Sequence, residues 1–378
     1  MLFKATLTEV YGEECEKFVK VLQVIDSLEI SGAEVLLADL VPFFQQRGID
    51  LSMFLLNSTG SHLERKLENM GVCFLPAIQA NVYSPKHILR LARQLEHFDL
   101  IHVHLFPAQL WAAMAKRLSE KRTVLITTEH STYNYRRKAW FRPIDRWMYS
   151  QYSAIACISQ DALSALIDWV PDTAGKATVI PNGIDFERIT AARVVSKSKI
   201  PLDDSRPVIL SIGRLQPQKD HAATLRAITK IPDAQLVIVG VGKMREQLEH
   251  LAISLGITDR VHFLGRRLDV PELIKMADIY VQSSNFEGFG IAALEAMAGG
   301  LPVIASDVPG LNHVVDGAGI LFPPGDSDAL AEAISSLLSS QELRSKLSQD
   351  GIEKAKKFSI EKTAELYIEL YQRYVNSS

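Results

Sequence analysis

Two glutamates close to one predicted helix have the type and spacing to bind hydroxyl groups. Glu287 and Glu295 lie in the segment SSNFEGFGIAALEAM, residues 283–297, where an apolar strand pattern ends and a glycine-punctuated loop leads into a helix near Gly290. Each carboxylate can accept two charge-assisted hydrogen bonds, and N–H groups at a helix amino end can approach a phosphate or a sugar hydroxyl. Glu295 lies among apolar residues, so we expect it in a pocket or an ion pair, with one glutamate facing a sugar and the other a ribose.

Two basic residues have the placement to bind a diphosphate. Arg214 and Lys219 lie in the segment SIGRLQPQKDH, residues 211–221, which begins as an apolar strand pattern ends. This places Arg214 at the carboxyl end of a strand and Lys219 near the start of a helix, where two cations can neutralise a diphosphate as it leaves. Either cluster alone has an ordinary explanation, an exposed loop or a solvated helix. Together in one half of the chain they favour a binding site.

The composition narrows the class of protein. With 378 residues, 47% hydrophobic and 22% charged, the chain has the balance of a soluble globular protein of two domains. The net charge of −3 argues against general nucleic-acid binding. Of the three cysteines, Cys15, Cys73 and Cys157, the last two lie in apolar runs, so we expect both to be buried in a reducing compartment.

The membrane signals are weak along the whole sequence. No apolar run approaches the roughly 18 residues that span a bilayer, and the amino terminus has acidic residues where a signal peptide would be apolar. We therefore expect a cytoplasmic protein, with peripheral contact to the inner face of the plasma membrane left open. Residues 1–18 receive no role.

Short apolar runs alternate with helical patterns along the whole chain. Such runs, hydrophobic almost throughout, are typical of parallel strands covered on both faces by helices. The predicted strands are 20–26, 50–56, 100–104, 123–128, 154–159 and 178–180 in the first half, and 208–212, 235–239, 261–264, 279–282, 302–305 and 319–321 in the second.

This alternation predicts the α/β class, with two doubly wound, Rossmann-like domains that face a central cleft. A turn-rich break at residues 180–185, IPNGID, divides them. We expect residues 1–185 to bind the acceptor and residues 186–358 to bind the donor, with a final helix in residues 359–378 packing back on the first domain.

The ordered motifs resemble retaining glycosyltransferase family 4, which has the GT-B fold. Glu287 and Glu295 match the family's E-x7-E signature, and the other matching motifs occur in the family's order over most of the chain. They are SGAEVLLADL at 31–40, LITTEH ending at His130, IPNGID at 180–185 and GRLQPQK at 213–219. The E-x7-E spacing alone would be weak, whereas the combination is highly specific.

The resemblance assigns roles to individual residues. It implies that Glu287 holds the donor sugar, that Glu295 holds the ribose and that Arg214 and Lys219 bind the diphosphate. His130 corresponds to a family histidine near the primary hydroxyl of the sugar; without the resemblance, a capping role would be favoured. The remaining donor-binding positions are the loop residue Gly32 of the first domain and the backbone of Gly288, Phe289, Gly290 and Ile291.

Two positions depart from the family's pattern. Ser31-Gly32 stands where the family often has two glycines, a change that is tolerable. Lys219-Asp220 stands where it often has Lys-Gly. The second change puts a carboxylate beside the phosphate site, where it either perturbs Lys219 or points away.

Two competing motifs have simpler explanations. Gly240-Val241-Gly242 follows a strand but lacks the third glycine of a dinucleotide-binding loop, which disfavours an NAD-dependent dehydrogenase. Asp326-Ser327-Asp328 is similar to a metal-binding Asp-x-Asp, yet it follows a turn and precedes a helix, so we interpret it as a cap. No cluster has metal-ligand spacing, and we expect neither a metal nor a cofactor, with Arg214 and Lys219 in the cation's place.

A basic region lies in the first half of the chain. Residues 116–146 include nine basic and three acidic residues. Cations and aromatics alternate within it, a mixture that suits an anionic membrane or a phosphate-linked lipid acceptor, although a solvated loop is equally compatible. The residues singled out are Arg136, Arg137, Lys138, Trp140 and Arg142.

The function that these features predict is retaining, metal-independent transfer of a sugar from a nucleotide-diphosphate sugar to a hydroxyl of a glycan or lipid-linked acceptor. A UDP-sugar is favoured on frequency and GDP-mannose is the other candidate. Two alternatives stay open: a nucleotide-sugar epimerase or hydrolase of the same architecture, and a non-catalytic nucleotide-sugar sensor. The complete set of four charged residues argues against the sensor.

Overall fold

The computed structural model describes residues 19–29, 31–75, 81–119, 123–134, 136–194, 200 and 202–376. Cys15 and the rest of residues 1–18 lie outside these ranges, as does most of the segment between 195 and 201. Within the described residues, no helix is long and apolar enough to cross a membrane.

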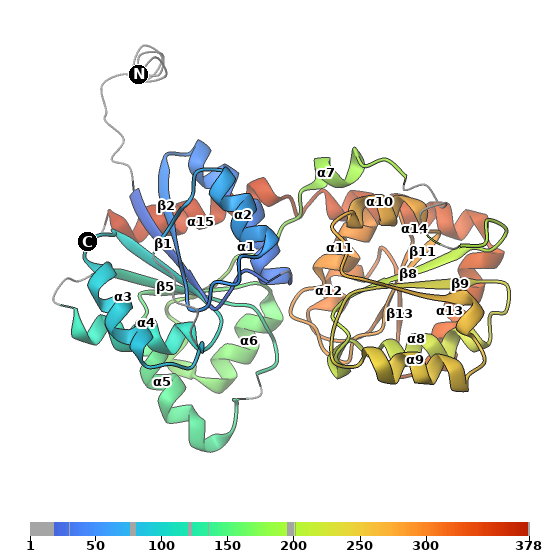
Figure 1. The fold of residues 1–378 in the computed structure, drawn as a ribbon, viewed down its shortest axis with the longest axis horizontal. Helices are drawn as coiled ribbons and strands as arrows, with labels where there is room; N and C mark the ends of the chain where they lie inside the picture. The colour runs from blue at the N-terminus through green and yellow to red at the C-terminus, as the bar shows by residue number, and fades with distance from the viewer. Residues whose placement is uncertain are drawn as a thin grey trace, which may run out of the picture.

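The described chain forms two parallel α/β units side by side (Figure 1). The first sheet has the order β3-β2-β1-β4-β5-β6-β7 and the second β10-β9-β8-β11-β12-β13. The strands of the first are β1 Val19–Ile25, β2 Ile49–Leu55, β3 Cys73–Phe74, β4 Leu100–His104, β5 Val124–Glu129, β6 Ala154–Cys157 and β7 Ala177–Val179; those of the second are β8 Val208–Ile212, β9 Gln235–Val239, β10 Val261–Gly265, β11 Ile279–Gln282, β12 Val303–Ser306 and β13 Ile320–Phe322.

Helices cover both faces of each sheet, as near-continuous apolar strands require. On the first sheet, one apolar core is closed by α1, α2 and α15 and the opposite one by α3 to α6. On the second, α8, α9 and α13 cover one face and α10, α11 and α12 the other. The bounds are α1 Gly32–Gln46, α2 His62–Asn69, α3 Lys86–Leu95, α4 Ala108–Leu118, α5 Arg142–Ser150, α6 Gln160–Trp169, α7 Phe186–Thr190, α8 His221–Thr229, α9 Arg245–Ser254, α10 Val270–Met276, α11 Ile291–Ala298, α12 Leu311–Val315, α13 Ser327–Ser339, α14 Gln341–Ala355 and α15 Ile360–Val375.

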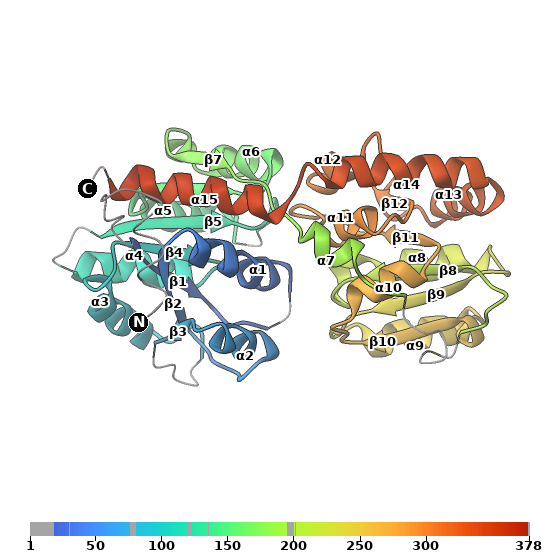
Figure 2. The same cartoon turned by 90° about the horizontal axis from the view of Figure 1, so that it is seen from above.

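The last helix returns to the first unit. After α14 packs on the second unit, the chain crosses back and α15 lies along the first sheet against α1 (Figure 2). The two crossing connections touch where Ile184 N–H donates to the Phe358 carbonyl at 2.9 Å and Ile360 N–H donates to the Ile184 carbonyl at 3.0 Å. A side chain at Gly183 would come within 2.5 Å of the Ser359 carbonyl, so the crossing needs glycine.

The predicted α/β class with two doubly wound sheets and a returning helix is confirmed, and most strand limits agree within two residues. The two-residue edge strand β3 was not predicted from the sequence. The expectation that Cys73 is buried is wrong, because Cys73 lies in that short edge strand and is exposed, whereas Cys157, the last residue of β6, is buried as expected.

Candidate functional site

Each sheet reverses its strand order at one point. In the first sheet the reversal lies between β1 and β4, and in the second between β8 and β11. Ligands of open α/β sheets bind beyond the carboxyl ends of strands at such points. A cavity of about 1050 Å³ lies between the two units and is lined by residues that follow all four strands.

The cavity gathers every residue that the sequence analysis assigned to donor binding or catalysis. From the first unit come the residues beyond β1 and β5, and from the second those beyond β8 and β11. The lining includes Gly32, His130, Arg214, Lys219, Glu287, Gly288, Phe289, Gly290, Ile291 and Glu295.

Lys219 and Glu287 form an ion pair in the lining of the cavity. The same Glu287 oxygen accepts hydrogen bonds from Gln282 Nε2 at 2.7 Å and Ser284 Oγ at 3.2 Å. Burial alone would raise the pKa of Glu287, but the ammonium of Lys219, the Ser284 hydroxyl and the Gly288 N–H lower it below the usual value. Glu287 is therefore a fixed carboxylate, and Lys219 is held in place beside it.

Glu295 lies in the second turn of α11 and faces a different cation. Arg188, from the connecting helix α7, is 3.8 Å from Glu295 and 3.4 Å from Asp39 of α1. Burial raises the pKa of Glu295 to about 7, with Arg188 lowering it and Asp39 raising it. Glu295 thus changes charge near neutral pH and is linked to the first unit through Arg188.

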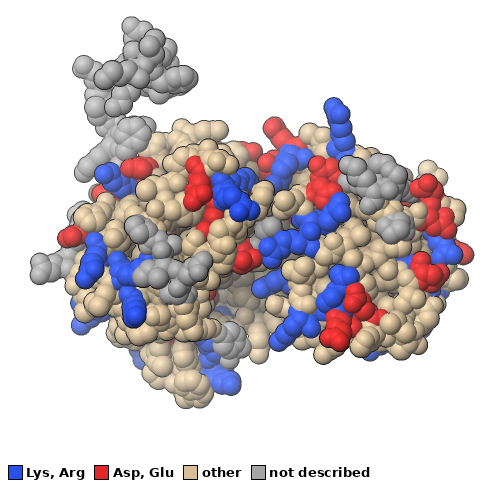
Figure 3. Space-filling view, viewed as in Figure 1, with Lys and Arg blue, Asp and Glu red and all other residues tan. Residues whose placement is uncertain are grey.

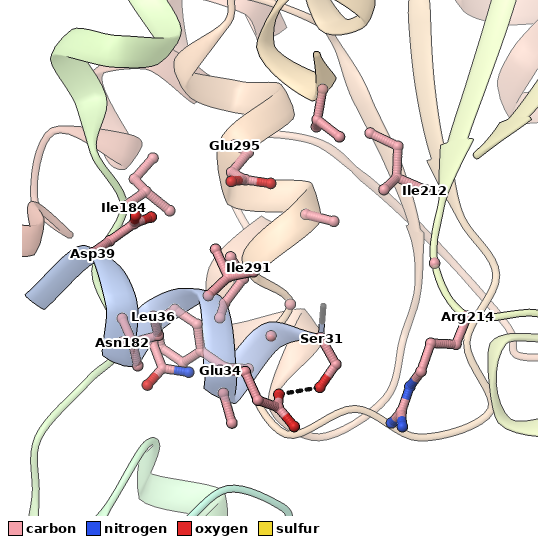
Figure 4. Close-up of a pocket in the computed structure, with 18 of the residues that line it drawn as sticks. Ser31, Glu34, Leu36, Asp39, Asn182, Ile184, Ile212, Arg214, Ile291 and Glu295 are labelled. Atoms are coloured by element: carbon pink, nitrogen blue, oxygen red, sulfur yellow. Dashed lines mark hydrogen bonds between the residues drawn. The ribbon is translucent and has the colours of Figure 1, made fainter. Parts of the chain in front are cut away.

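Arg214 extends into the cavity from the end of β8, opposite the amino end of α1 (Figure 4). There Ser31 Oγ donates to the Glu34 carboxylate, and burial raises the pKa of Glu34 while Arg214 lowers it. Neither Glu34 nor Arg188 was predicted from the sequence as part of the site. The Ser-x-x-Glu spacing at 31–34 is visible in the sequence, but it reads as a helix cap.

The glycines of the second unit's loop allow close contact with the first unit. A side chain at Gly288 would come within 2.5 Å of the His130 carbonyl, and Ser159 Oγ donates to the Gly288 carbonyl at 3.1 Å. Thr132 Oγ1 donates to the Glu287 carbonyl at 2.9 Å. Gly290 caps α11 with φ of 93°, a left-handed conformation that favours glycine. The loop that carries Glu287 is thereby fixed against strands β5 and β6.

The side chain of Asp220, which stands where the family often has glycine, points away from the proposed phosphate site. Lys219 ends a 3-10 turn rather than starting a helix, and Asp220 caps α8 by accepting from Ala223 N–H at 3.3 Å. Asp220 has φ of 41°, which explains why glycine suits this position.

The two competing motifs have structural roles. Asp326 caps α13 by accepting from Asp328 N–H at 3.0 Å and Ala329 N–H at 2.9 Å, as predicted. A side chain at Gly240 would lie 1.9 Å from the Gly213 carbonyl, so the glycine serves loop packing. Among the described residues, no group of three or more His, Cys, Asp or Glu is arranged to hold a metal ion.

His130 lines the cavity on the first unit's side. Its Nε2 is 3.1 Å from Nδ1 of His104, and burial lowers the pKa of His130 to about 4. The imidazole is therefore neutral at physiological pH and can exchange a neutral hydrogen bond with a hydroxyl.

Basic side chains also gather on the second unit along the furrow between the units (Figure 3). Those lining the cavity there include Arg214, Arg266 and Arg267. Such a rim attracts a polyanion to the cleft.

The basic region of the first unit divides into buried and exposed residues. Arg136 is 5% exposed, pairs with Asp145 at 2.7 Å and stacks over Phe106, so it is not part of an exposed surface. Arg137 donates to the Thr132 carbonyl at 2.9 Å. Lys138, Trp140 and Arg142 are exposed, and Trp140 is 69% accessible.

Comparison with known proteins gives matches over both halves of the chain. Residues 30–188 match the family model "Glycosyltransferase Family 4" and residues 194–354 match "Glycosyl transferases group 1". EpsD of Bacillus subtilis (strain 168), itself a candidate glycosyltransferase, is 30% identical over 338 residues, which cover 83% of this chain and 88% of EpsD.

A second relative is the Escherichia coli UDP-Gal:alpha-D-GlcNAc-diphosphoundecaprenol alpha-1,3-galactosyltransferase, 27% identical over 289 residues, 71% of this chain and 74% of the enzyme. Among solved structures, Anabaena Alr3699/HepE in complex with UDP and glucose superposes with a TM-score of 0.82 at 22% identity, over 93% of this chain and 99% of HepE. The superposition shows that the two chains share the GT-B fold.

Proposed function

Because the chain belongs to glycosyltransferase family 4, a retaining family, we propose that it transfers a sugar from a UDP-sugar to a hydroxyl of a glycan or lipid-linked acceptor. The observation that carries the proposal is the convergence of Arg214, Lys219, Glu287 and Glu295 on one cavity between the two sheets. The cations suit a diphosphate, and the carboxylates suit a sugar and a ribose.

The reaction we propose has a short sequence of bond changes. The acceptor oxygen attacks the anomeric carbon from the side of the leaving diphosphate, and the anomeric C–O bond breaks with its electron pair passing to the diphosphate. The acceptor's proton passes to a phosphate oxygen of the donor. Arg214 and Lys219 stabilise the charge on the departing diphosphate, a contribution worth roughly 100- to 1,000-fold in rate for each well-placed donor.

The two carboxylates position the donor. Glu287 is held by Lys219, Gln282 and Ser284 and binds sugar hydroxyls without reorganising. The loop residues Gly288, Phe289, Gly290 and Ile291 present backbone groups beside it, and Gly32 approaches the diphosphate from the first unit. His130 meets a sugar hydroxyl, and Glu295 receives the ribose.

UDP is the favoured nucleotide, with GDP-mannose as the other candidate. UDP is present in the complex of HepE, and the E. coli relative is named for UDP-galactose. Both likenesses support a uridine donor without specifying the sugar.

We propose that residues 1–185 bind the acceptor, with the last helix packed against them, and that residues 186–358 bind the donor. The E. coli relative is named for an acceptor linked to diphosphoundecaprenol, which supports a lipid-linked acceptor here. The exposed Trp140, Ile144 and Trp147 lie beside Lys138 and Arg142, the combination that suits an anionic membrane surface. Peripheral contact of α5 with the cytoplasmic face would bring the cleft to such an acceptor.

A panel of nucleotide sugars tests the proposal. A donor that binds the folded protein raises its melting temperature, and the best binder is then assayed for turnover with and without lipid-linked glycans. Transfer that depends on acceptor supports the proposal. Donor conversion that no acceptor affects would favour the epimerase or hydrolase. Donor binding without any turnover would favour the non-catalytic sensor.

A further inference from the structure

A strip of polar side chains lies on the face of the first sheet that α15 covers. Gln23 pairs with His102 in the register of β1 and β4, and His104 pairs with Thr128 in the register of β4 and β5. Residues two apart on a strand face the same side, so His102 and His104 both point toward α15. All four are buried, in the midst of an apolar core.

Hydrogen bonds join this strip to both α15 and the cavity. Tyr371 of α15 accepts from Gln23 Nε2 at 3.0 Å and contacts His102 Nδ1 at 2.6 Å. Gln23 Oε1 is 2.8 Å from His104 Nε2, and His104 Nδ1 is 3.1 Å from Nε2 of His130. The path from Tyr371 to the cavity thus runs through Gln23 and His104.

The direction of each hydrogen bond follows from the chemistry of its atoms. Gln23 Oε1 only accepts, so His104 Nε2 carries the proton between them. Burial lowers the pKa of His104 well below its usual value, so His104 is neutral and its Nδ1 is an acceptor. His130 must then donate from Nε2, and since His130 is also neutral, its Nδ1 holds a lone pair.

We propose that Gln23 and Tyr371 are positioning residues that act through His104 to hold His130 in its Nε2–H form, so that the Nδ1 lone pair accepts a hydrogen bond from a donor-sugar hydroxyl. Tyr371 fixes the amide of Gln23 by accepting from its Nε2, which leaves the Tyr371 hydroxyl hydrogen to bond Nδ1 of His102. The packing of the last helix on the first sheet thereby determines which ring nitrogen of His130 donates and which accepts. The sugar contact rests on the proposed function, whereas the proton positions do not.

Nitrogen NMR of the full chain with labelled histidine tests the proton positions directly, because the two neutral forms of imidazole have distinct ring-nitrogen shifts. His130→Asn and His104→Asn identify the two signals among the 10 histidines. We expect both residues as Nε2–H at pH 7. A wild-type His130 that is Nδ1–H, mixed or charged would overturn the proposal.

Tyr371→Phe and Gln23→Leu remove the fixing groups with little change of volume. Either variant is expected to convert His130 to a mixture of its two neutral forms. Tyr367→Phe is the matched control: Tyr367 is also buried on α15, but its hydroxyl contacts Thr128 at 3.1 Å and leaves Gln23 fully bonded. If Tyr371→Phe does not fold, the same measurement is made on Gln23→Leu. An unchanged His130 in a folded variant, or an equal change in Tyr367→Phe, would refute the role of Tyr371 and Gln23.

Affinities separate this proposal from the proposed function. UDP lacks the sugar, so Tyr371→Phe and Gln23→Leu should leave its Kd unchanged while weakening the UDP-sugar about 3- to 10-fold, the worth of one neutral hydrogen bond. His130→Ala should weaken the UDP-sugar at least as much. If a variant changes the proton position on His130 but not the Kd of the UDP-sugar, the sugar contact alone is overturned. If the wild type binds no nucleotide sugar, the proposed function is overturned while the NMR result stands.

Discussion

Lys219 and Glu287 form a largely buried ion pair, with side chains 15% and 13% exposed, between the loops that follow β8 and β11. The proposed phosphate-binding cation and sugar-binding carboxylate therefore hold each other in position before any ligand arrives. Such preorganisation reduces the rearrangement needed in the transition state.

Arg214→Ala is expected to lower turnover roughly 100- to 1,000-fold with unchanged stability, since Arg214 is exposed and faces the cavity. Steady-state kinetics and thermal unfolding measure the two effects. Lys243→Ala, an exposed lysine on a neighbouring loop, is the control and should retain wild-type turnover. Activity near wild type in Arg214→Ala would contradict the diphosphate role.

Lys219→Ala should reduce both activity and stability. It leaves the carboxylate of Glu287 buried without its cation, which costs about 3 kcal/mol. Adding Glu287→Gln removes the unpaired charge, so the double variant should recover part of the free energy of unfolding but no activity. Denaturant unfolding checks this, and additive losses in the double variant would show that the pair is not coupled.

Nucleotide affinity should depend on the charge of Glu295. Its pKa of about 7 means that the carboxylate, the form that accepts from ribose hydroxyls, is present above that pH, so UDP affinity should rise as pH increases through 7. Arg188→Ala should move the midpoint up, because Arg188 lowers this pKa, and Asp39→Asn should move it down.

Calorimetric titration with UDP between pH 5.5 and 8.5 measures that profile. Glu295→Gln is the control and should keep only the pH dependence that comes from the terminal phosphate of UDP, whose second pKa is about 6. A wild-type profile identical to that of Glu295→Gln would argue against a ribose contact by Glu295.

Gly288→Ala is expected to disturb the donor loop. Its new methyl group would lie 2.5 Å from the backbone carbonyl of His130, so the loop must shift, and a displacement near 1 Å costs about 100-fold in rate. Gly175→Ala is the matched control, because a side chain there meets nothing within 4 Å. Equal activity of the two variants would show that this contact between the units is not needed for turnover.

Membrane contact should depend on the exposed face of η1, Ala139–Phe141, and α5. Two variants should sediment less with anionic vesicles: the single variant Trp140→Ser and the double variant Lys138→Ala/Arg142→Ala. Each cation near the surface contributes about 1 kcal/mol to the binding free energy. Ile253→Ser and Lys346→Ala, exposed on the second unit, serve as controls. Wild-type protein that stays in the supernatant would remove the membrane proposal.

The sequence predicted those features that local pattern determines. Apolar runs located β8, β9 and β11 at their observed limits, and the motif order placed Arg214 and Glu295 in one site. The edge strand β3 has only two residues, too few for an apolar run to be visible.

Other features depend on distant parts of the chain. Gln23 and Tyr371 are 348 residues apart and meet only because α15 returns to the first sheet. In the sequence, Gln23 is visible only as a polar residue in an apolar strand. The alternation His102-x-His104 indicates that these two histidines share one face of the sheet, but it does not show which residue contacts them. Arg188 likewise becomes part of the site only when α7 bridges the two units.

Isothermal titration of UDP and a UDP-sugar panel into the wild type and the Arg214→Ala/Lys219→Ala variant measures whether these two cations hold the donor. We expect the wild type to bind UDP and at least one UDP-sugar, and the double variant, still folded by circular dichroism, to lose both. A wild type that binds no uridine or guanosine diphosphate sugar, or a double variant that binds with unchanged affinity, would contradict this expectation.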